Sequence, residues 1–323
     1  MPDSDPLNAI EWSRRPVLIV GDDGETVFER AEVEAPAAWT ASAVSVVASR
    51  YLQDGARSSV RDLIDRVART LADWTDDGDS YAALVDLLVQ QRGAFNSPVW
   101  FNVGLDERPQ CSACFILSVE DDLNSILDLA RTEGLIFKRG SGTGVNLSSL
   151  RSRRERLSGG GTASGPVSFM RGYDAFAGVV KSGGRTRRAA KMQILDAGHP
   201  DVVEFARAKS LEERKAQVLM AAGYDGGLDG EAYRSVAFQN ANLSVRVSDS
   251  FLRAAEEGRD WTTFAVRDRA PVETFPARDL LRAVAEGSWV CGDPGLQYET
   301  TIEAWHTCPA SGRIRASNPC SEY

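Results

Sequence analysis

The stretch that decides the fold is residues 114–119 (CFILSV) together with residues 120–134 (EDDLNSILDLARTEG). A short apolar run of this kind suits a buried β-strand. Acidic residues favour the start of a helix, where Asp121 and Asp122 would act as the cap and the first turn. The residues that then share one helical face are Leu123, Ile126, Leu127, Ala130 and Gly134. The stretch therefore predicts a strand followed by a helix.

The same alternation continues toward the C-terminus. Strand-like segments fall at residues 143–147, 192–195 and 243–247, and helix-like segments at 167–179, 201–208, 250–257 and 277–285. Strands that alternate with helices indicate an α/β architecture.

The N-terminal part has a different pattern. Residues 1–58 mix proline, charge and short apolar pieces, and we expect a lead-in with one helix near residues 41–51. Apolar residues then recur at helical spacing after Ser58 or Ser59 as the N-cap, at Val60, Leu63, Ile64, Val67 and Leu71. A second helix around residues 84–88 ends near Gly93. These helices predict a small helical layer before the main domain.

Composition sets the broad class. The 323 residues are 43% apolar and 26% charged, as in an ordinary globular protein. The N-terminus lacks the apolar core of a signal peptide, and the chain lacks an apolar run of membrane-spanning length, so we expect a cytoplasmic protein without a membrane partner. The net charge of -9 argues against nucleic acid as a partner. Basic runs at 151–156 and 185–191 could bind phosphate locally, although solvated faces are commoner.

Five cysteines occur without a secretion signal, which makes a structural disulfide framework unlikely. Cys291 and Cys308 lack the spacing of a zinc site, and we expect no metal site in this chain. Cys111 and Cys114 form a C-x-x-C pair, but positions i and i+3 of a strand point to opposite faces. A direct disulfide between them is therefore less favoured than separate roles.

The last six residues, 318–323 (NPCSEY), concentrate chemistry. In an extended loop Asn318, Cys320 and Glu322 would share one face. The thiol could be a nucleophile, a metal ligand or the carrier of a one-electron oxidised sulfur, or it could be incidental to an Asn-Pro turn. A Cys-His protease is disfavoured because only His199 and His306 are available, in no recognisable order.

Glycine is concentrated at residues 140–144 (GSGTG) and 159–165 (GGGTASG). Both stretches could let backbone N–H groups approach a phosphate, and both could equally be flexible turns. Neither has the spacing of a P-loop or of G-x-G-x-x-G.

Six stretches together resemble one family. They are 95–102 (FNSPVWFN), 110–115 (QCSACF), 140–146 (GSGTGVN), 184–192 (GRTRRAAKM), 292–297 (GDPGLQ) and 317–323 (SNPCSEY). In this order they resemble the adenosylcobalamin-dependent (class II) ribonucleotide reductases. The resemblance implies a ten-stranded α/β barrel around a finger loop that carries a radical cysteine. Because that family's catalytic chain is considerably longer, we expect an N-terminal lead-in and helical domain over 1–95 and an incomplete barrel over 96–323.

The resemblance also implies the chemistry. It matches Cys320 to the thiyl radical formed with adenosylcobalamin, Glu322 to the base for the 3′-hydroxyl proton, Asn318 to the amide on the substrate, and Cys114 to the first redox cysteine. The implied activity is that of a vitamin B12-dependent ribonucleoside-diphosphate reductase with a thioredoxin- or glutaredoxin-type reductant. The second redox cysteine would lie beyond Tyr323, so the chain alone should not turn over.

Further positions are matched to binding roles. The substrate-binding set is Ser97 at the phosphate, Ala113 and Cys114 at the ribose, Ser148 near the base, and Asn318, Pro319, Cys320, Ser321 and Glu322 in the loop. The resemblance places a dNTP or ATP effector at Asp121, Asp122 and Leu123, where a helix cap can exist simultaneously. A homodimer through helices near this effector site is compatible with the resemblance.

Three alternatives stay open. One is a class I reductase large subunit, whose radical comes from a separate protein. Another is a nucleotide-binding module without catalysis. The third is a thiol oxidoreductase built on Cys111, which predicts a lowered thiol pKa at that residue.

Overall fold

The computed structural model describes residues 5–21, 24–52, 59–75, 79–180, 190–227 and 230–319. The chain divides into two compact units, residues 1–113 and 114–323. The sequence predicts a domain boundary at residue 95, where the family's barrel domain would begin. The division into compact units does not test that boundary, which stays a prediction.

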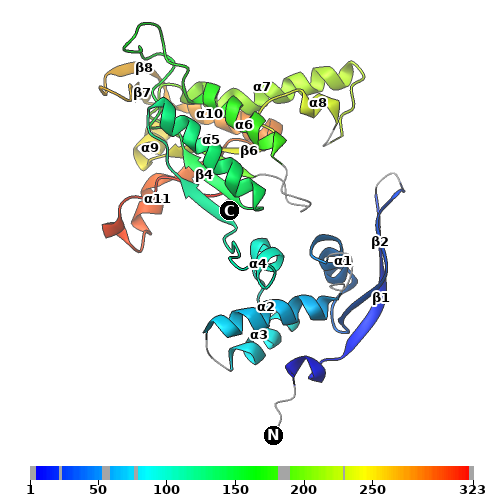
Figure 1. Ribbon diagram of the computed structural model, residues 1–323. Helices are drawn as coiled ribbons and strands as arrows, with labels where there is room; N and C mark the ends of the chain where they lie inside the picture. The colour runs from blue at the N-terminus through cyan, green and yellow to red at the C-terminus, as the bar shows by residue number, and fades with distance from the viewer. Residues whose placement is uncertain are drawn as a thin grey trace. The chain divides into compact units, whose positions relative to one another are not determined.

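The first unit combines a β-hairpin with helices (Figure 1). Its elements are η1 (Pro6–Ala9), β1 (Trp12–Val20), β2 (Thr26–Pro36), α1 (Ala41–Arg50), α2 (Val60–Thr75), α3 (Ser80–Val89) and α4 (Ser97–Asn102). The helices expected near residues 41–51, 60–71 and 84–88 are confirmed. The antiparallel β1–β2 pair was missed, because few of its side chains are buried, chiefly Val17, Val33 and Ala35. A strand pair with so few buried positions gives a weak alternation signal.

The second unit is built on a parallel five-stranded sheet. Its strands are β3 (Cys114–Leu117), β4 (Gly142–Asn146), β5 (Lys191–Asp196), β6 (Ala241–Val247) and β9 (Gly295–Tyr298), in that spatial order. The other elements are α5 (Leu123–Lys138), α6 (Pro166–Val179), α7 (Val202–Ala221), α8 (Glu231–Arg234), α9 (Asp249–Glu257), β7 (Asp260–Phe264), β8 (Pro271–Pro276), α10 (Ala277–Cys291), α11 (Glu299–Ala304) and η2 (Pro309–Ser311). The α/β prediction is confirmed.

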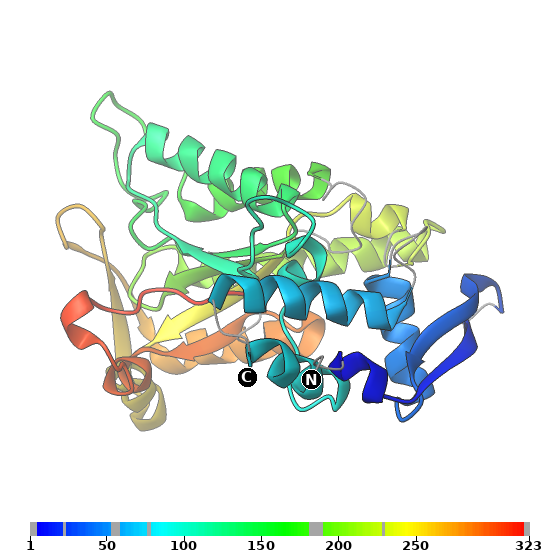
Figure 2. The same ribbon diagram turned by 60° about the horizontal axis from the view of Figure 1, so that its bottom comes forward.

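The two faces of this sheet differ in composition. Val145, Leu195 and Leu243 belong to the main hydrophobic core, which they share with the long helices. Helices α5 and α6 lie along one side of the sheet (Figure 2). Because side chains alternate along a strand, the neighbouring positions point to the opposite face, which carries glycine and polar residues on β4. That second face is the one available for a site.

A buried ion pair ties α5 to β4 and β5. Lys191 Nζ lies 2.7 Å from Glu133 Oε2 and donates to the carbonyl of Tyr173 (3.0 Å), and Thr143 Oγ1 donates to Glu133 Oε1 (2.9 Å). Both charged side chains are at most 1% exposed. Burial lowers the pKa of Lys191, and the Glu133 carboxylate opposes this shift. Loss of one partner would leave an unpaired buried charge, at a cost of about 3–5 kcal/mol.

His199 is a buried neutral ring in the same unit. The amide of Asp201 donates to its Nδ1 (3.0 Å), so Nε2 carries the proton and donates to the carbonyl of Leu150 (2.8 Å). Burial lowers the pKa of His199 below its ordinary value of 6.5, since the charged form would lose its hydration.

This burial predicts a pH-dependent stability. Below about pH 6.5 the unfolded chain takes up a proton at position 199 that the folded chain resists, so the folded state is destabilised as the pH falls, by up to about 1.4 kcal/mol per pH unit. The variant His199→Gln has no titratable group at this position, so its stability lacks this contribution to the pH dependence. Urea unfolding should be measured at pH 7.5 and at pH 5.5 for both proteins. The free energy of unfolding of the wild type should exceed that of the variant by less at pH 5.5 than at pH 7.5. A gap of constant size would contradict the argument.

Candidate functional site

The segment of residues 313–319 crosses the second face of the parallel sheet. Asn146 Nδ2 donates to the carbonyl of Arg315 (2.9 Å), and Gln297 Nε2 donates to Ser317 Oγ (2.7 Å). Arg246 donates to the carbonyl of Ile314. Between these bonds Ala316 packs on Met192 and Ile194 of β5. Side chains from β4, β5, β6 and β9 thus hold this segment, which we name the terminal segment.

Two glycines of β4 let the terminal segment approach the sheet closely. A methyl group added at Gly144 would collide with the carbonyl oxygen of Ser317 and would lie 3.2 Å from Asn318 Cα. A methyl group at Gly142 would lie 3.0 Å from Pro319 Cγ and 3.2 Å from Cys114 Sγ. Positions 142 and 144 are two residues apart on one strand and share a face. We call this pair the glycine cradle.

The glycine cradle lies beside two of the four expected catalytic residues, Cys114 and Asn318. The Cys114 thiol on β3 and the ring of Pro319 both border Gly142, and Asn318 lies over Gly144. Pro319 is the residue that precedes Cys320. The expected residues Cys320, Ser321 and Glu322 lie outside the described residues.

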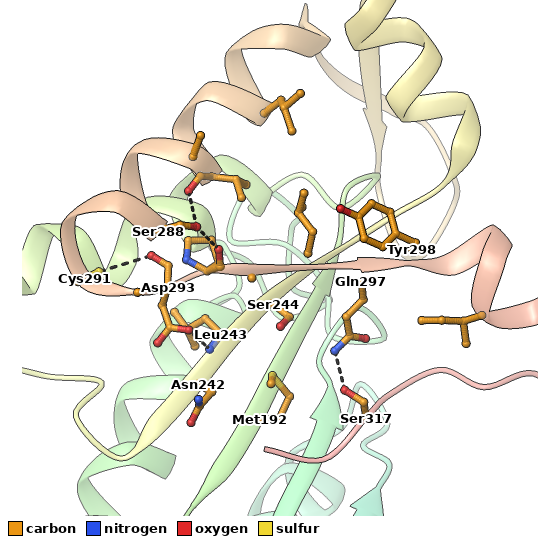
Figure 3. A pocket seen from close by; sticks show the side chains of 18 of the residues that line it. Met192, Asn242, Leu243, Ser244, Ser288, Cys291, Asp293, Gln297, Tyr298 and Ser317 are labelled. Carbon is orange, nitrogen blue, oxygen red and sulfur yellow. Dashed lines mark hydrogen bonds between the residues drawn. The ribbon is translucent and has the colours of Figure 1, made fainter. Parts of the chain in front are cut away.

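A pocket of about 920 Å³ lies beside the terminal segment, between β6, β9 and α10 (Figure 3). Apolar side chains of α10, β9 and α11 line much of it, namely Leu281, Val284, Leu296 and Ile302. Ser317 reaches the pocket through its bond with Gln297, and Ser288 donates to the carbonyl of Pro294 (2.5 Å) at its wall. Cys291 also lines the pocket, and burial raises the pKa of this thiol.

Ser148 lies at the other end of the sheet from Cys114. Cys114 pairs with Gly142 at the amino end of β4, whereas Ser148 follows the carboxyl end of that strand. The strand spans about 13 Å at about 3.3 Å per residue. Ser148 Oγ accepts a hydrogen bond from the amide of Asp196 (2.8 Å) and borders a second pocket, of about 850 Å³. The structure does not bring Ser148 together with the Cys114 thiol.

Two expected binding residues belong to the first unit. Ser97 is the first residue of α4, and its hydroxyl lies 3.0 Å from that of Tyr51. Ala113 is half-buried and is the last residue of this unit.

Cys111, in the same unit, is a free thiol, so it does not pair with Cys114. Burial raises the pKa of Cys111. The thiol-oxidoreductase alternative predicts a lowered pKa for Cys111. That prediction is wrong, which weakens this alternative.

The expected effector residues surround the start of α5. Asp121 accepts hydrogen bonds from the amide (3.0 Å) and Nε (2.6 Å) of Arg151. Asp122 caps the helix by accepting from the amides of Asn124 and Ser125. Leu123, the first helical residue, is 63% exposed. The helix-cap interpretation of Asp122 is thus confirmed, while the effector role of all three residues stays a prediction.

Sequence reasoning missed the role of the glycine cradle. Residues 140–144 were taken as a phosphate loop or a flexible turn, yet Gly142 and Gly144 lie within β4. The expected strand, residues 143–147, already contained Gly144 and directly followed Gly142, and glycine at these positions was the signal for a close backbone approach.

The described ranges contain neither a metal-binding cluster nor a membrane-spanning helix. No three His, Cys, Asp or Glu side chains of these residues are grouped so that they could hold a metal ion. No helix among them is long and apolar enough to cross a membrane.

Comparison with known proteins identifies the fold of the second unit. Residues 112–323 match the family model described as the ribonucleotide reductase barrel domain. The chain belongs to the ribonucleotide reductase family. Curated relatives named vitamin B12-dependent ribonucleotide reductase include those of Rhodopirellula baltica and Streptomyces coelicolor. Each is 48% identical to this chain over 98% of its length, and the match covers 35% of the first relative and 34% of the second. The resemblance seen in the sequence motifs is thereby confirmed.

Two further similarities bear on the reductase. A Mycobacterium tuberculosis relative, named vitamin B12-dependent ribonucleoside-diphosphate reductase, is 37% identical over 87% of this chain. The solved alpha subunit of the Actinobacillus ureae class Id ribonucleotide reductase superposes with a TM-score of 0.64 at 18% identity, covering 85% of this chain and 44% of its own. That likeness supports the fold alone. The chain spans about a third of the length of the first curated relatives.

The glycine cradle yields a direct test. Gly144→Ala should displace the terminal segment, because its methyl group and the Ser317 carbonyl cannot occupy the same space. Trypsin should then cleave after Arg315 at least about tenfold faster, since roughly 1.4 kcal/mol of lost anchoring corresponds to that factor.

Gly172→Ala is the matched control, because a methyl group at this helical position meets no atom within 4 Å among the described residues. Equal cleavage of the two variants would contradict a tight approach at Gly144.

Proposed function

We propose that the full-length protein reduces ribonucleotides to 2′-deoxyribonucleotides through a thiyl radical at Cys320. The observation that supports this most strongly is the convergence of Cys114 Sγ and Pro319 on Gly142. It puts the Cys114 thiol beside the residue that precedes Cys320. The names of the relatives, which carry vitamin B12-dependent reductase activity in their descriptions, support the same reaction class.

Each residue has a defined part in this proposal. The Cys320 thiyl takes the 3′ hydrogen atom of the ribose, and Glu322 accepts the 3′-hydroxyl proton. Asn318 hydrogen-bonds the substrate. The 2′-hydroxyl leaves as water with a proton from the Cys114 thiol, and Cys114 with a second thiol supplies the two electrons and becomes a disulfide. Cys320 then returns the hydrogen atom to C3′, which restores the thiyl. An external thioredoxin- or glutaredoxin-type dithiol then reduces that disulfide. The diphosphate level of the substrate follows the name of the Mycobacterium tuberculosis relative.

We propose adenosylcobalamin as the cofactor, because the relatives are named vitamin B12-dependent ribonucleotide reductases. Its corrin ring ligates its own cobalt, so the protein must provide enclosure rather than metal ligands. The glycine cradle lets the backbone of the terminal segment, which precedes Cys320, lie directly against β4. When bound, adenosylcobalamin supplies the one-electron oxidant for the Cys320 thiol.

The experiment uses the full-length reductase with adenosylcobalamin under anaerobic conditions. Mixing with a ribonucleoside diphosphate and a dithiol should give a cob(II)alamin electron paramagnetic resonance signal and a deoxynucleotide. Cys320→Ser should lose both. Cys114→Ser should keep the signal and lose at least about 1000-fold in product formation, because it removes a reductant and not the radical.

Two results would decide against the proposal. Turnover that needs a separate metal-containing protein and gives no cob(II)alamin would establish a class I enzyme. Nucleotide binding with full activity in Cys320→Ser would establish that this cysteine carries no radical.

We further propose that the reductase is a homodimer through α5 and α6. These helices expose apolar side chains on the second unit, namely Leu123, Leu127, Leu135, Phe176 and Val179. Exposed apolar patches of this kind mark interaction surfaces. Gly134 lets α6 approach α5, because a methyl group there would lie 2.6 Å from the Phe176 ring. The expected effector residues begin α5, so a dNTP or ATP at Asp121 and Asp122 could influence the same interface.

A charge on this surface tests the dimer. Leu127 is 59% exposed, so Leu127→Glu should leave folding intact and weaken dimerisation at least about 100-fold, since an unpaired carboxylate would be buried. Light scattering of the full-length protein should report monomers. Leu157→Glu, at a 43% exposed loop position, is the control and should stay dimeric. If both variants are dimers, α5 is not part of the dimer interface.

A further inference from the structure

The hydroxyl of Ser97 has a neighbour that the sequence motifs did not indicate. Tyr51 follows the last residue of α1, and its hydroxyl lies 3.0 Å from Ser97 Oγ. The two residues are 46 positions apart in the chain. Both are half-buried, so the pair borders solvent at one side and packed side chains at the other.

The Tyr51 ring is fixed by packing. It stacks on Phe101 with ring centroids 5.3 Å apart and an interplanar angle of 22°. Phe101 is on α4, the same short helix that begins with Ser97. The stack and the hydroxyl contact therefore attach Tyr51 to one helix at two points.

The rest of α4 is also held in place, and none of its anchors uses the Ser97 hydroxyl. Asn96 Oδ1 caps the helix by accepting from the amide of Val99 (3.3 Å). Arg66 donates to the carbonyl of Trp100 (2.7 Å) at the other end, and the Trp100 indole donates to the carbonyl of Phe95 (2.9 Å). The Ser97 side chain is thus not required as a helix cap.

The direction of the Tyr51–Ser97 hydrogen bond follows from acidity. Either hydroxyl can be the donor at this distance. Because a phenol is more acidic than an aliphatic alcohol, we infer that the Tyr51 O–H donates to Ser97 Oγ. The proton of Ser97 is then directed away from Tyr51. A hydroxyl whose oxygen already accepts a bond is a better donor to an anionic oxygen, because hydrogen bonds in a chain polarise one another.

We propose that Tyr51 is a positioning residue that orients the Ser97 hydroxyl toward a phosphate oxygen of the ribonucleotide. This inference rests on the proposed function and on the sequence resemblance, which matches Ser97 to the substrate phosphate. It adds a residue outside the recognised motifs to substrate binding, and it gives Tyr51 no role in the radical steps.

The test compares full-length variants under steady-state turnover. Tyr51→Phe keeps the stack on Phe101 and removes only the hydroxyl. The KM for the ribonucleotide should rise about 3- to 10-fold with kcat within about 2-fold, the pattern for loss of binding that is equal in ground and transition states. Inhibition by the corresponding nucleoside, which lacks the phosphate, should not change. The double variant Tyr51→Phe/Ser97→Ala should bind no more weakly than Ser97→Ala alone.

Tyr81→Phe is the matched control in the same unit. The Tyr81 hydroxyl donates to Asp65 (2.5 Å) and not to α4, so its removal should leave the KM unchanged. An unchanged KM in Tyr51→Phe with a raised KM in Ser97→Ala would overturn the inference and leave the proposed function standing. An unchanged KM in both would overturn the phosphate assignment of Ser97 itself. A raised KM accompanied by equally weakened nucleoside inhibition would show a merely structural role and would also overturn the inference.

Discussion

The close approach of the terminal segment to β4 is the constraint on which the site depends. It is a steric condition and not an attractive one: only hydrogen fits where the Cβ of residue 144 would be. The hydrogen bonds from Asn146, Gln297 and Arg246 then fix the segment along its length. Because these donors come from β4, β6 and β9, the position of the terminal segment depends on how these three strands are arranged in the sheet.

A buried polar group supports the sheet behind the glycine cradle. Glu133 and Lys191 lie on the helix-facing side of β4 and β5, and Thr143 of the cradle strand joins them. Thr143 stands between Gly142 and Gly144, so its side chain points to the opposite face from the cradle. Three consecutive residues of β4 thus serve both faces of the sheet. Thr143 makes its buried hydrogen bond on the helix-facing side, and Gly142 and Gly144 face the terminal segment. Motion of β4 away from α5 would break the buried hydrogen bond from Thr143 to Glu133, a partner of this ion pair.

Much of the second unit could be predicted from the sequence, and the limits have physical causes. Segments with long apolar periodicity, such as 167–179 and 277–285, were correctly assigned as helices. The strand β9 was missed because it has four residues and only Gln297 is buried. The hairpins β1–β2 and β7–β8 have mixed surfaces and give little alternation. For the site, the motifs located Cys114 and Asn318, but the Tyr51–Ser97 contact joins residues 46 positions apart, which no local pattern encodes.

The cysteines show why packing decides chemistry that spacing leaves open. Cys111 and Cys114 have the spacing of a redox motif, yet they belong to different compact units. Burial raises the pKa of Cys111 and of Cys291, which keeps both thiols protonated near neutral pH, and a protonated thiol is a poor nucleophile. Cys114 differs through its location, since it borders the cradle and the residue before Cys320. A thiol that acts as a reductant beside a radical requires proximity and exclusion of water more than it requires a low pKa. The glycine cradle provides the proximity, because Gly142 has no side chain between the Cys114 thiol and Pro319, and the reductant role of Cys114 stays a proposal.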